Sequence, residues 1–264
     1  MGKKMKNAPV YFTVAQVRFN PVLNMEGYLS TIQERMRKTL FPDFRRENIQ
    51  QLILPFAPPA DGSQPPSPSF VPKARCIFGS IDRSTEFVLE NSSLGLQTTA
   101  YETSDIFFKT MLDGLKIIHE AVQLDFTERI GLRYCDAVLP TPQQSLSDYL
   151  TPEVLGLCNK LEGKLIHSYS ETVVMNKSGQ LVSRVIIQDG HVGLPIDLAE
   201  LAPRIKPKFS EPEGRHAIID TDASCEQREV FNLERLNSKL EEFHTEIWKS
   251  FRSIVTPFAL KSWA

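Results

Sequence analysis

The chain opens with an alternation of apolar and polar positions that predicts a β-strand. Residues 10–19 (VYFTVAQVRF) are rich in β-branched and aromatic side chains, and Asn20-Pro21 ends the run. The period then changes to that of a helix over about 25–39, with Asn24 as the expected N-cap and basic residues near the end. A strand followed by a short amphipathic helix is therefore expected first.

Four further segments predict strands separated by polar breaks. They lie at 49–56, 74–81, 85–90 and 94–101. A long helix is then predicted from about residue 103 to Leu124, because its apolar residues recur at helical spacing. These residues are Phe108, Met111, Leu112, Leu115, Ile118 and Val122.

Proline is concentrated in one part of the chain. Seven of the 18 prolines fall between Pro55 and Pro72, together with Gly62 and three serines. This composition does not pack a core, so we expect an exposed, extended loop over 55–72 that is an insertion between two strands. A Pro-rich ligand for another domain is the alternative interpretation.

After Phe126 the pattern starts again. A strand predicted at 129–134 precedes a helical segment at 144–158, which Pro152 interrupts. A hairpin, a helical turn, a strand and a second long helix complete the chain. They are predicted at 164–175 with 180–188, at 197–201, at 216–221 and at 232–253.

This recurrence indicates an internal duplication. The apolar positions of the first long helix recur 125 positions later in the second, and Arg18 of the first strand recurs 115 positions later as Arg133. Any two amphipathic helices align in this way, but the shared order of elements is harder to obtain by chance. The sequence therefore predicts two β-α-β(3-4)-α halves, at 1–126 and 127–264, in one fused globular unit.

Two such halves are expected to give an α+β fold. The tandem repeats would form one curved antiparallel sheet backed by the two long helices. That topology resembles the saddle of the TATA-binding-protein-like fold, which implies a concave surface able to hold a ligand or a partner. A fold does not by itself define a function.

Three segments of the sequence resemble a known family. They are APVYFTVAQVRFNPV near the start, TERIGLRYCD in the centre and FRSIVTPFALKSWA at the end. They are similar to sporadically distributed bacterial and archaeal proteins that have no assigned activity. The resemblance implies a prokaryotic, soluble, single-chain protein and supplies no catalytic residues. The patchy distribution of such proteins suggests an accessory role in genome defence or in a toxin–antitoxin system.

The composition argues against a general nucleic-acid-binding, membrane-spanning or secreted protein. Lysine and arginine total 30 against 32 acidic residues, a net charge of −2, so no general attraction to nucleic acid or acidic membranes is expected. Small basic clusters at 3–6, 35–46 and 204–208 keep a nucleic-acid-binding factor as an alternative. No apolar run is long enough to span a bilayer and no signal peptide is recognised. Four scattered cysteines favour a reduced, cytoplasmic protein.

Catalytic motifs for phosphate binding, dinucleotide binding and serine hydrolysis are missing from the sequence. The best chemical candidate is AIIDTDAS, in which a strand expected to end near Asp220 and Asp222 would present two carboxylates to Mg²⁺. Too few residues follow for a phosphatase domain of that kind, and the first half has no matching acids. We therefore expect no metal and no cofactor, and keep a metal-dependent hydrolase using Asp220 and Asp222 as an alternative.

Arg18 and Arg133 stand out because each interrupts a strongly apolar strand at an equivalent repeat position. Two guanidinium groups brought together on a sheet would bind a phosphate or carboxylate. They are the predicted ligand-binding residues. The alternatives are an outward-facing side chain or an ion pair with an acid such as Glu171.

These observations predict a non-enzymatic binding or protein-interaction module. Its partner would be another protein or a small anionic ligand, held on the concave sheet or on the long helices. The aromatic residues Trp248, Phe258 and Trp263 near the end are expected either to pack onto the sheet or to form a homodimer surface.

Overall fold

The structure is a computed structural model that describes residues 5–53, 69–158, 160–201 and 203–264, with side chains described outside 49–53 and 69–73. Within these residues the fold is α+β. Nine strands form one open antiparallel sheet in the order β2-β3-β4-β5-β1-β6-β9-β8-β7. The strands are β1 (Val10–Phe19), β2 (Asp43–Ile53), β3 (Ser69–Gly79), β4 (Thr85–Glu90), β5 (Ser93–Thr98), β6 (Phe126–Val138), β7 (His167–Asn176), β8 (Gly179–Gln188) and β9 (His216–Val230).

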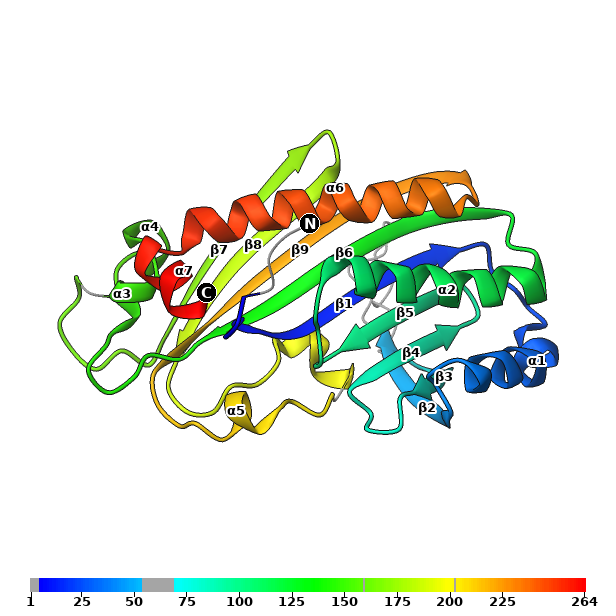
Figure 1. The fold of residues 1–264 in the computed structure, drawn as a ribbon, viewed down its shortest axis with the longest axis horizontal. Helices are drawn as coiled ribbons and strands as arrows, with labels where there is room; N and C mark the ends of the chain where they lie inside the picture. Colours follow the sequence, from blue (N-terminus) through cyan, green and yellow to red (C-terminus); the bar gives the residue numbers. More distant parts are fainter. Residues whose placement is uncertain (1–4, 54–68, 159, 202) are drawn as a thin grey trace, which may run out of the picture.

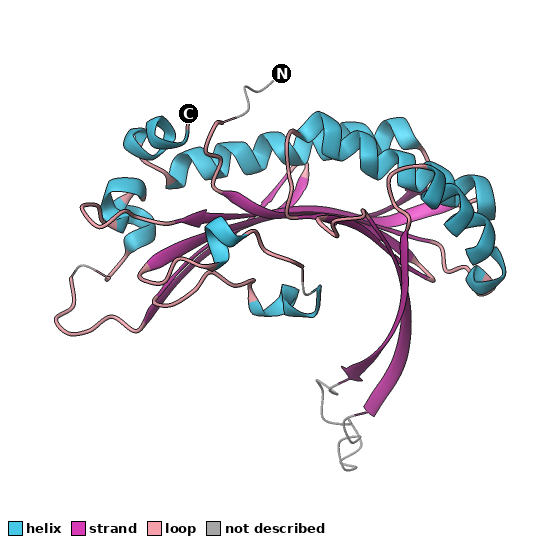
Figure 2. Ribbon diagram, turned by 60° about the horizontal axis from the view of Figure 1, so that its bottom comes forward, coloured by secondary structure: helices cyan, strands magenta, loops and turns pink. Residues whose placement is uncertain are grey.

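Helices cover one face of this sheet (Figure 1). The two longest described helices are α2 (Ser104–Val122) and α6 (Leu233–Ile254), and α1 (Met25–Lys38) packs beside α2. The remaining helices are short: α3 (Leu146–Tyr149), α4 (Pro152–Leu155), the 3₁₀ helix η1 (Ile196–Leu201), α5 (Pro207–Ser210) and α7 (Pro257–Trp263). We call the opposite face of the sheet, toward which β2 and β3 bend, the concave face (Figure 2).

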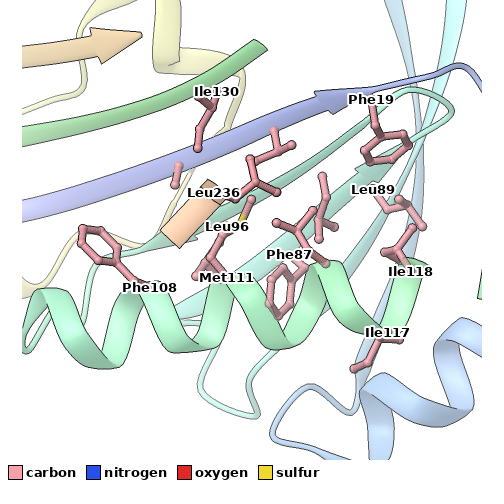
Figure 3. Close-up of a cluster of buried hydrophobic side chains, with 14 of the residues drawn as sticks. Phe19, Phe87, Leu89, Leu96, Phe108, Met111, Ile117, Ile118, Ile130 and Leu236 are labelled. Atoms are coloured by element: carbon pink, nitrogen blue, oxygen red, sulfur yellow. The ribbon is translucent and has the colours of Figure 1, made fainter. Parts of the chain in front are cut away.

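The main core lies between the helices and the sheet. Alternate residues of the strands point toward the helices, and α1, α2 and α6 cover them with their apolar faces. Figure 3 shows this packing for α2, whose Met111 and Ile118 lie on the side of Phe87 and Leu89. Gly114 of α2 brings this helix directly over the ring of Phe87 in β4. Side chains from both ends of the chain therefore share one core, because Phe19, Phe87 and Leu240 belong to the same cluster.

Side-chain caps define the starts of the two long helices. Thr103 accepts a hydrogen bond from the backbone N–H of Ile106, and Asn232 accepts one from that of Arg235. Asn24 precedes α1 as expected but makes no side-chain cap hydrogen bond. Local sequence thus places all three helix starts, and Asn24 is the N-cap residue of α1 as predicted.

Several strand boundaries differ from the sequence-based expectation, and polar residues conceal those of β2 and β9. Strand β2 begins at Asp43 and not near residue 49. Its first part contains Arg45 and Arg46, whose charges are paired with Glu86 and Glu26 in the folded chain. Strand β9 continues beyond residue 221 to Val230 by pairing with β6. Charged side chains are compatible with a strand where they are exposed or paired, so hydrophobic alternation underestimates both strands.

The predicted loop over 55–72 falls largely on residues 54–68, which lie outside the described residues. Its last part is not a loop, because β3 begins at Ser69 and its Pro72 lies opposite Gln50 of β2. The pairing of β3 with β4 starts only at Cys76. Among the described strands, Pro72 therefore pairs only with β2, at the edge position in which a strand tolerates the missing N–H of proline.

The end of the chain packs against a second, smaller core. Trp263 of α7 is buried against Tyr149 and Phe251. Trp248 and Phe258 remain 41% and 42% exposed, so the three aromatic residues do not share one environment. No helix in the described part of the chain is both long enough and apolar enough to cross a membrane.

Candidate ligand-binding site

The concave face of the sheet is partly covered by residues 189–215, which connect β8 to β9 and contain η1 and α5 (Figure 2). Phe209 of α5 lies against Tyr11 of β1, with ring centroids 5.9 Å apart. The Tyr11 hydroxyl donates a hydrogen bond to the carbonyl of Gly193 at 2.7 Å. This connection is therefore fixed to the sheet by both apolar and polar contacts.

A buried arginine lies at the centre of this face. Arg133 of β6 is only 8% exposed, and its Nε and Nη2 donate to the two carboxylate oxygens of Asp220 at 2.6 and 2.7 Å. Its Nη1 and Nη2 also donate to the carboxylate of Asp197 at 2.6 and 3.0 Å. Two carboxylates thus bind one planar guanidinium in bidentate fashion, the strongest geometry for such a pair.

The ion-pair network continues across the sheet. Asp220 of β9 is fully buried and accepts a third hydrogen bond from Nη1 of Arg184, the residue opposite it on β8, at 3.2 Å. Nε of Arg184 donates to Glu171 of β7 at 2.6 Å. A buried carboxylate is stable only when it is paired and hydrogen-bonded, and Asp220 meets both conditions.

The pKa values follow from this pairing. Burial acts to lower the pKa of Arg133, but hydrogen bonds to Asp197 and Asp220 outweigh it and hold that pKa above its ordinary value. The hydrogen bonds from Arg133 keep the pKa of Asp197 below its usual range. Both partners are therefore charged at neutral pH, and the pair holds η1 against the sheet.

A cavity of about 540 Å³ opens between η1 and the concave face. Its floor is made by one row of residues across three strands, because Gln16 of β1 lies opposite Gly95 of β5 and Gly131 of β6. Neither glycine places a side chain of its own on the floor, so the cavity reaches the backbone at Gly95, whereas the guanidinium of Arg129 lies beside Gly131. Leu198 and Leu201 of η1 form the apolar part of the roof.

The rows on either side of the floor supply polar walls. One row contains Gln97, Arg133 and Asp222, and the other contains Ser93 and Arg129. Nη1 of Arg129 lies 3.4 Å from the side-chain oxygen of Gln16, and its Nε lies 3.7 Å from Glu226. Arg75, Val14, Val88, Glu90, Leu132, Asp197 and Glu200 complete the lining.

Two acceptors in the lining are poorly paired. No described residue donates a hydrogen bond to the carboxylate of Asp222, and burial raises the pKa of this acid. Gln97 is 3% exposed, its amide nitrogen donates to Glu86 at 3.0 Å, and its amide oxygen has no partner among the described residues. An unpaired buried acceptor is costly, so the Gln97 oxygen favours a ligand that donates hydrogen bonds, and the half-buried Asp222 carboxylate offers a second acceptor to it.

The structure does not bring Arg18 and Arg133 together. Arg18 lies opposite Arg129, and Arg133 lies opposite Val14, so four residues of strand, about 13 Å, separate the two arginines along the sheet. Arg18 is exposed and near Glu128 at 4.0 Å, whereas Arg133 is buried and engaged by Asp220 and Asp197. The prediction that these two arginines bind one anion together is therefore wrong.

The alternative of an ion pair with an acid is confirmed for Arg133, but the acids are Asp220 and Asp197, because Glu171 pairs with Arg184 instead. Asp220 and Asp222 lie in the middle of β9 and not at a strand tip, because the strand continues to Val230. A divalent cation at Asp220 would compete with two guanidinium groups for the same oxygens. Within the described residues, no group of three or more histidine, cysteine or acidic side chains is arranged to hold a metal ion.

The cavity itself was not expected from the sequence, although one signal was present. A single glycine inside a strand often marks a place where a ligand or another chain approaches the backbone, and Gly95 and Gly131 both fit that description. Their neighbour Gln16 gives no such signal, and Asp197 is 64 positions from Arg133. Only the folded sheet brings these residues into one site.

Comparisons with known proteins add no functional information for this site. No family model matches the chain, and neither the curated proteins nor the solved structures compared with it gave a match.

Proposed function

We propose that this protein is a non-enzymatic binding module whose cavity on the concave face holds one small polar molecule. A volume of about 540 Å³ lies within the range of small-molecule sites. The lining combines a few apolar side chains from η1 with fixed polar groups from the strands, the usual composition of such a site.

The glycine pair that forms the floor is the observation that carries this proposal. Gly95 and Gly131 flank Gln16 in adjacent strands, so the side chains that would fill the cavity are missing from its centre. A Cβ atom at Gly95 would meet nothing closer than the carbonyl of Ala15 at 3.7 Å. The backbone there does not need glycine, which supports the interpretation that the empty space has a use.

A cavity-filling variant tests the proposal. We expect at least one compound in a panel of amino acids, amines, nucleosides, organic acids and inorganic phosphate to raise the Tm of the protein. At a ligand concentration of 100 times Kd, binding should raise the free energy of unfolding by about 2.7 kcal/mol, and this corresponds to a Tm increase of several degrees. The response should be lost in Gly95→Leu and kept in Ser224→Leu, which lies in the same row of the sheet beyond Gly131.

Ser224 does not line the cavity, so its variant controls for adding a leucine to this sheet. A panel without any stabilising compound would contradict the proposal. So would a compound that stabilises Gly95→Leu as strongly as the original protein.

We also propose that the scaffold arose by duplication, with α2 and α6 as equivalent backing helices. The first strands of the two halves, β1 and β6, are central neighbours, and each is flanked by the last strand of its own half. His119 of α2 stacks on Phe231 just before α6, and His244 of α6 contacts Phe108 of α2. This reciprocity supports a two-fold relation between the halves.

We also propose a cytoplasmic location and an accessory role for this binding module. The four free cysteines are consistent with a reduced compartment such as the cytoplasm. An accessory role in a prokaryotic defence or toxin–antitoxin system, with a protein partner or a second copy bound elsewhere on the surface, is compatible with a module that binds a small molecule.

A further inference from the structure

We infer that the cavity takes a small molecule carrying a protonated amine or a guanidinium group. This inference rests on the proposed function and specifies the chemical class of its ligand. The ligand is then a cation, whereas Arg18 and Arg133 led the sequence analysis to predict an anion.

Carboxylates outnumber guanidinium groups in the lining. The acids are Glu90, Asp197, Glu200 and Asp222, and the basic residues are Arg75, Arg129 and Arg133. A lining with this balance repels a phosphate or a second carboxylate unless the arginines are free to turn toward it.

The arginines are largely engaged elsewhere. Arg133 donates four hydrogen bonds to Asp220 and Asp197. Arg75 donates to the Glu47 carboxylate at 2.8 Å and to the backbone carbonyl of Glu200 at 3.0 Å. An anion in the cavity would have to break one of these charge-assisted pairs, and each is worth more than a hydrogen bond between neutral groups.

Arg129 is the least engaged of the three, with a long contact to Gln16 at 3.4 Å and an ion pair with Glu226 at 3.7 Å. Its guanidinium lies beside Gly131, where an added Cβ would approach it to 3.0 Å. Arg129 therefore borders the floor and is suited to the neutral or anionic end of a ligand, if the ligand has one.

Asp222 is the complementary group for a cation. It lies opposite Arg133 of β6 and Val182 of β8, on the cavity side of β9, and accepts no hydrogen bond from any described residue. A carboxylate in such surroundings is stabilised by a positive partner at hydrogen-bonding distance. Arg133 does not serve as this partner because its donors go to Asp220 and Asp197.

Gln97 gives an independent indication at the other end of the same row. Its buried amide oxygen lacks a donor, while its nitrogen is fixed by Glu86 and by the carbonyl of Leu201 at 3.5 Å. Because these bonds hold the amide plane in place, the oxygen is satisfied only by a donor that reaches it where it lies. Asp222 and Gln97 together offer acceptors to the N–H groups of one ligand.

Agmatine is a suitable probe because it carries an amine and a guanidinium at opposite ends of a short chain. Glutarate and inorganic phosphate are the anionic probes. We expect agmatine, measured by calorimetry and by Tm, to bind the full-length protein, and its Kd to rise at least tenfold in Asp222→Asn. The asparagine keeps the shape of the side chain and removes its charge, so folding should be unaffected.

The control is Glu229→Gln, which removes a carboxylate on the same strand outside the cavity lining and should leave the Kd within twofold. No agmatine binding at 10 mM, or equal binding by Asp222→Asn, would overturn the inference. Glutarate or phosphate binding that is lost in Gly95→Leu would also overturn it, while leaving the proposed binding function intact. Agmatine binding that persists in Gly95→Leu would contradict both.

Discussion

At the scale of single residues, the most informative groups are the buried carboxyls, because identical side chains meet different surroundings on β6 and β9. Asp220 is enclosed by two guanidinium groups. Asp136 follows Cys135 on β6 and points away from the concave face, and burial raises its pKa to about 7. Among the described residues, Asp136 therefore has no paired cation to offset the cost of ionisation, and Asp220 has two.

Asp136 makes the stability of the protein depend on pH. Its folded pKa of about 7 lies above the ordinary value of 3.8, so the folded state binds the proton more tightly than the unfolded state. The free energy of unfolding should then fall as the pH rises from about 4 to 7 and level off above that range. In Asp136→Asn this contribution disappears, and at pH 8 the variant should be more stable by about 2–4 kcal/mol.

Urea unfolding of both proteins at several pH values measures this difference. The gap between the variant and the original protein should close at pH 4, where the carboxyl is protonated in both states. A gap that stays constant between pH 4 and pH 8 would show that Asp136 is not the titrating group.

At the scale of elements, the approach of α2 to the sheet depends on one glycine. Alanine in place of glycine inside a helix usually stabilises it by about 1 kcal/mol. At Gly114, however, a Cβ atom would lie 2.4 Å from the ring of Phe87, which is buried in the main core. We expect Gly114→Ala to lower the free energy of unfolding by about 1–3 kcal/mol, because overpacking outweighs helix propensity.

Gly131→Ala is the matched comparison for this prediction. The nearest atom to its added Cβ is Nη1 of Arg129 at 3.0 Å, the end of a flexible side chain that has room to move. Gly131→Ala should change the free energy of unfolding by less than about 1 kcal/mol, and urea unfolding measures both variants. Equal stability of Gly114→Ala and the original protein would mean that α2 does not sit as close to β4 as described.

Elements with local signals were predicted well. Strands β1 and β4 begin and end where alternation places them, and Thr103 fixes the start of α2. The limits of β2 and β9 were missed because Arg45 and Glu226 are strand residues whose charge is paired or exposed. The partners of Arg133 were missed for a different reason: Asp197 and Asp220 reach it only through the sheet order and the path of η1.

At the scale of the whole molecule, the two predicted halves share their largest core. Leu236, Leu240 and Phe243 of α6 belong to the same cluster as Phe78 and Phe87 from the first half. Strands β1 and β6 are joined by a continuous ladder from Val17 to Thr13 of β1. We therefore expect one cooperative unfolding transition, because neither half can lose its structure without exposing the core of the other.

Two buried cysteines report on this cooperativity. Cys76 lies in β3 of the first half and Cys135 in β6 of the second, and they are 6% and 0% exposed. Brief alkylation at increasing urea, followed by mass spectrometry, should give the same midpoint for both thiols. Labelling of Cys76 at clearly lower urea than Cys135 would indicate that the halves unfold separately.

Single-nucleotide mutations at the glycine floor can change the volume of the cavity. Every glycine codon is one nucleotide away from codons for alanine and valine. At Gly95 either residue would project from the sheet without meeting the backbone closely. A single substitution would then narrow the site in steps of one to three carbon atoms while the strand ladder stays the same. Under the proposed function, the size of the ligand that fits would thus be adjustable at the codon of one residue whose replacement the backbone tolerates.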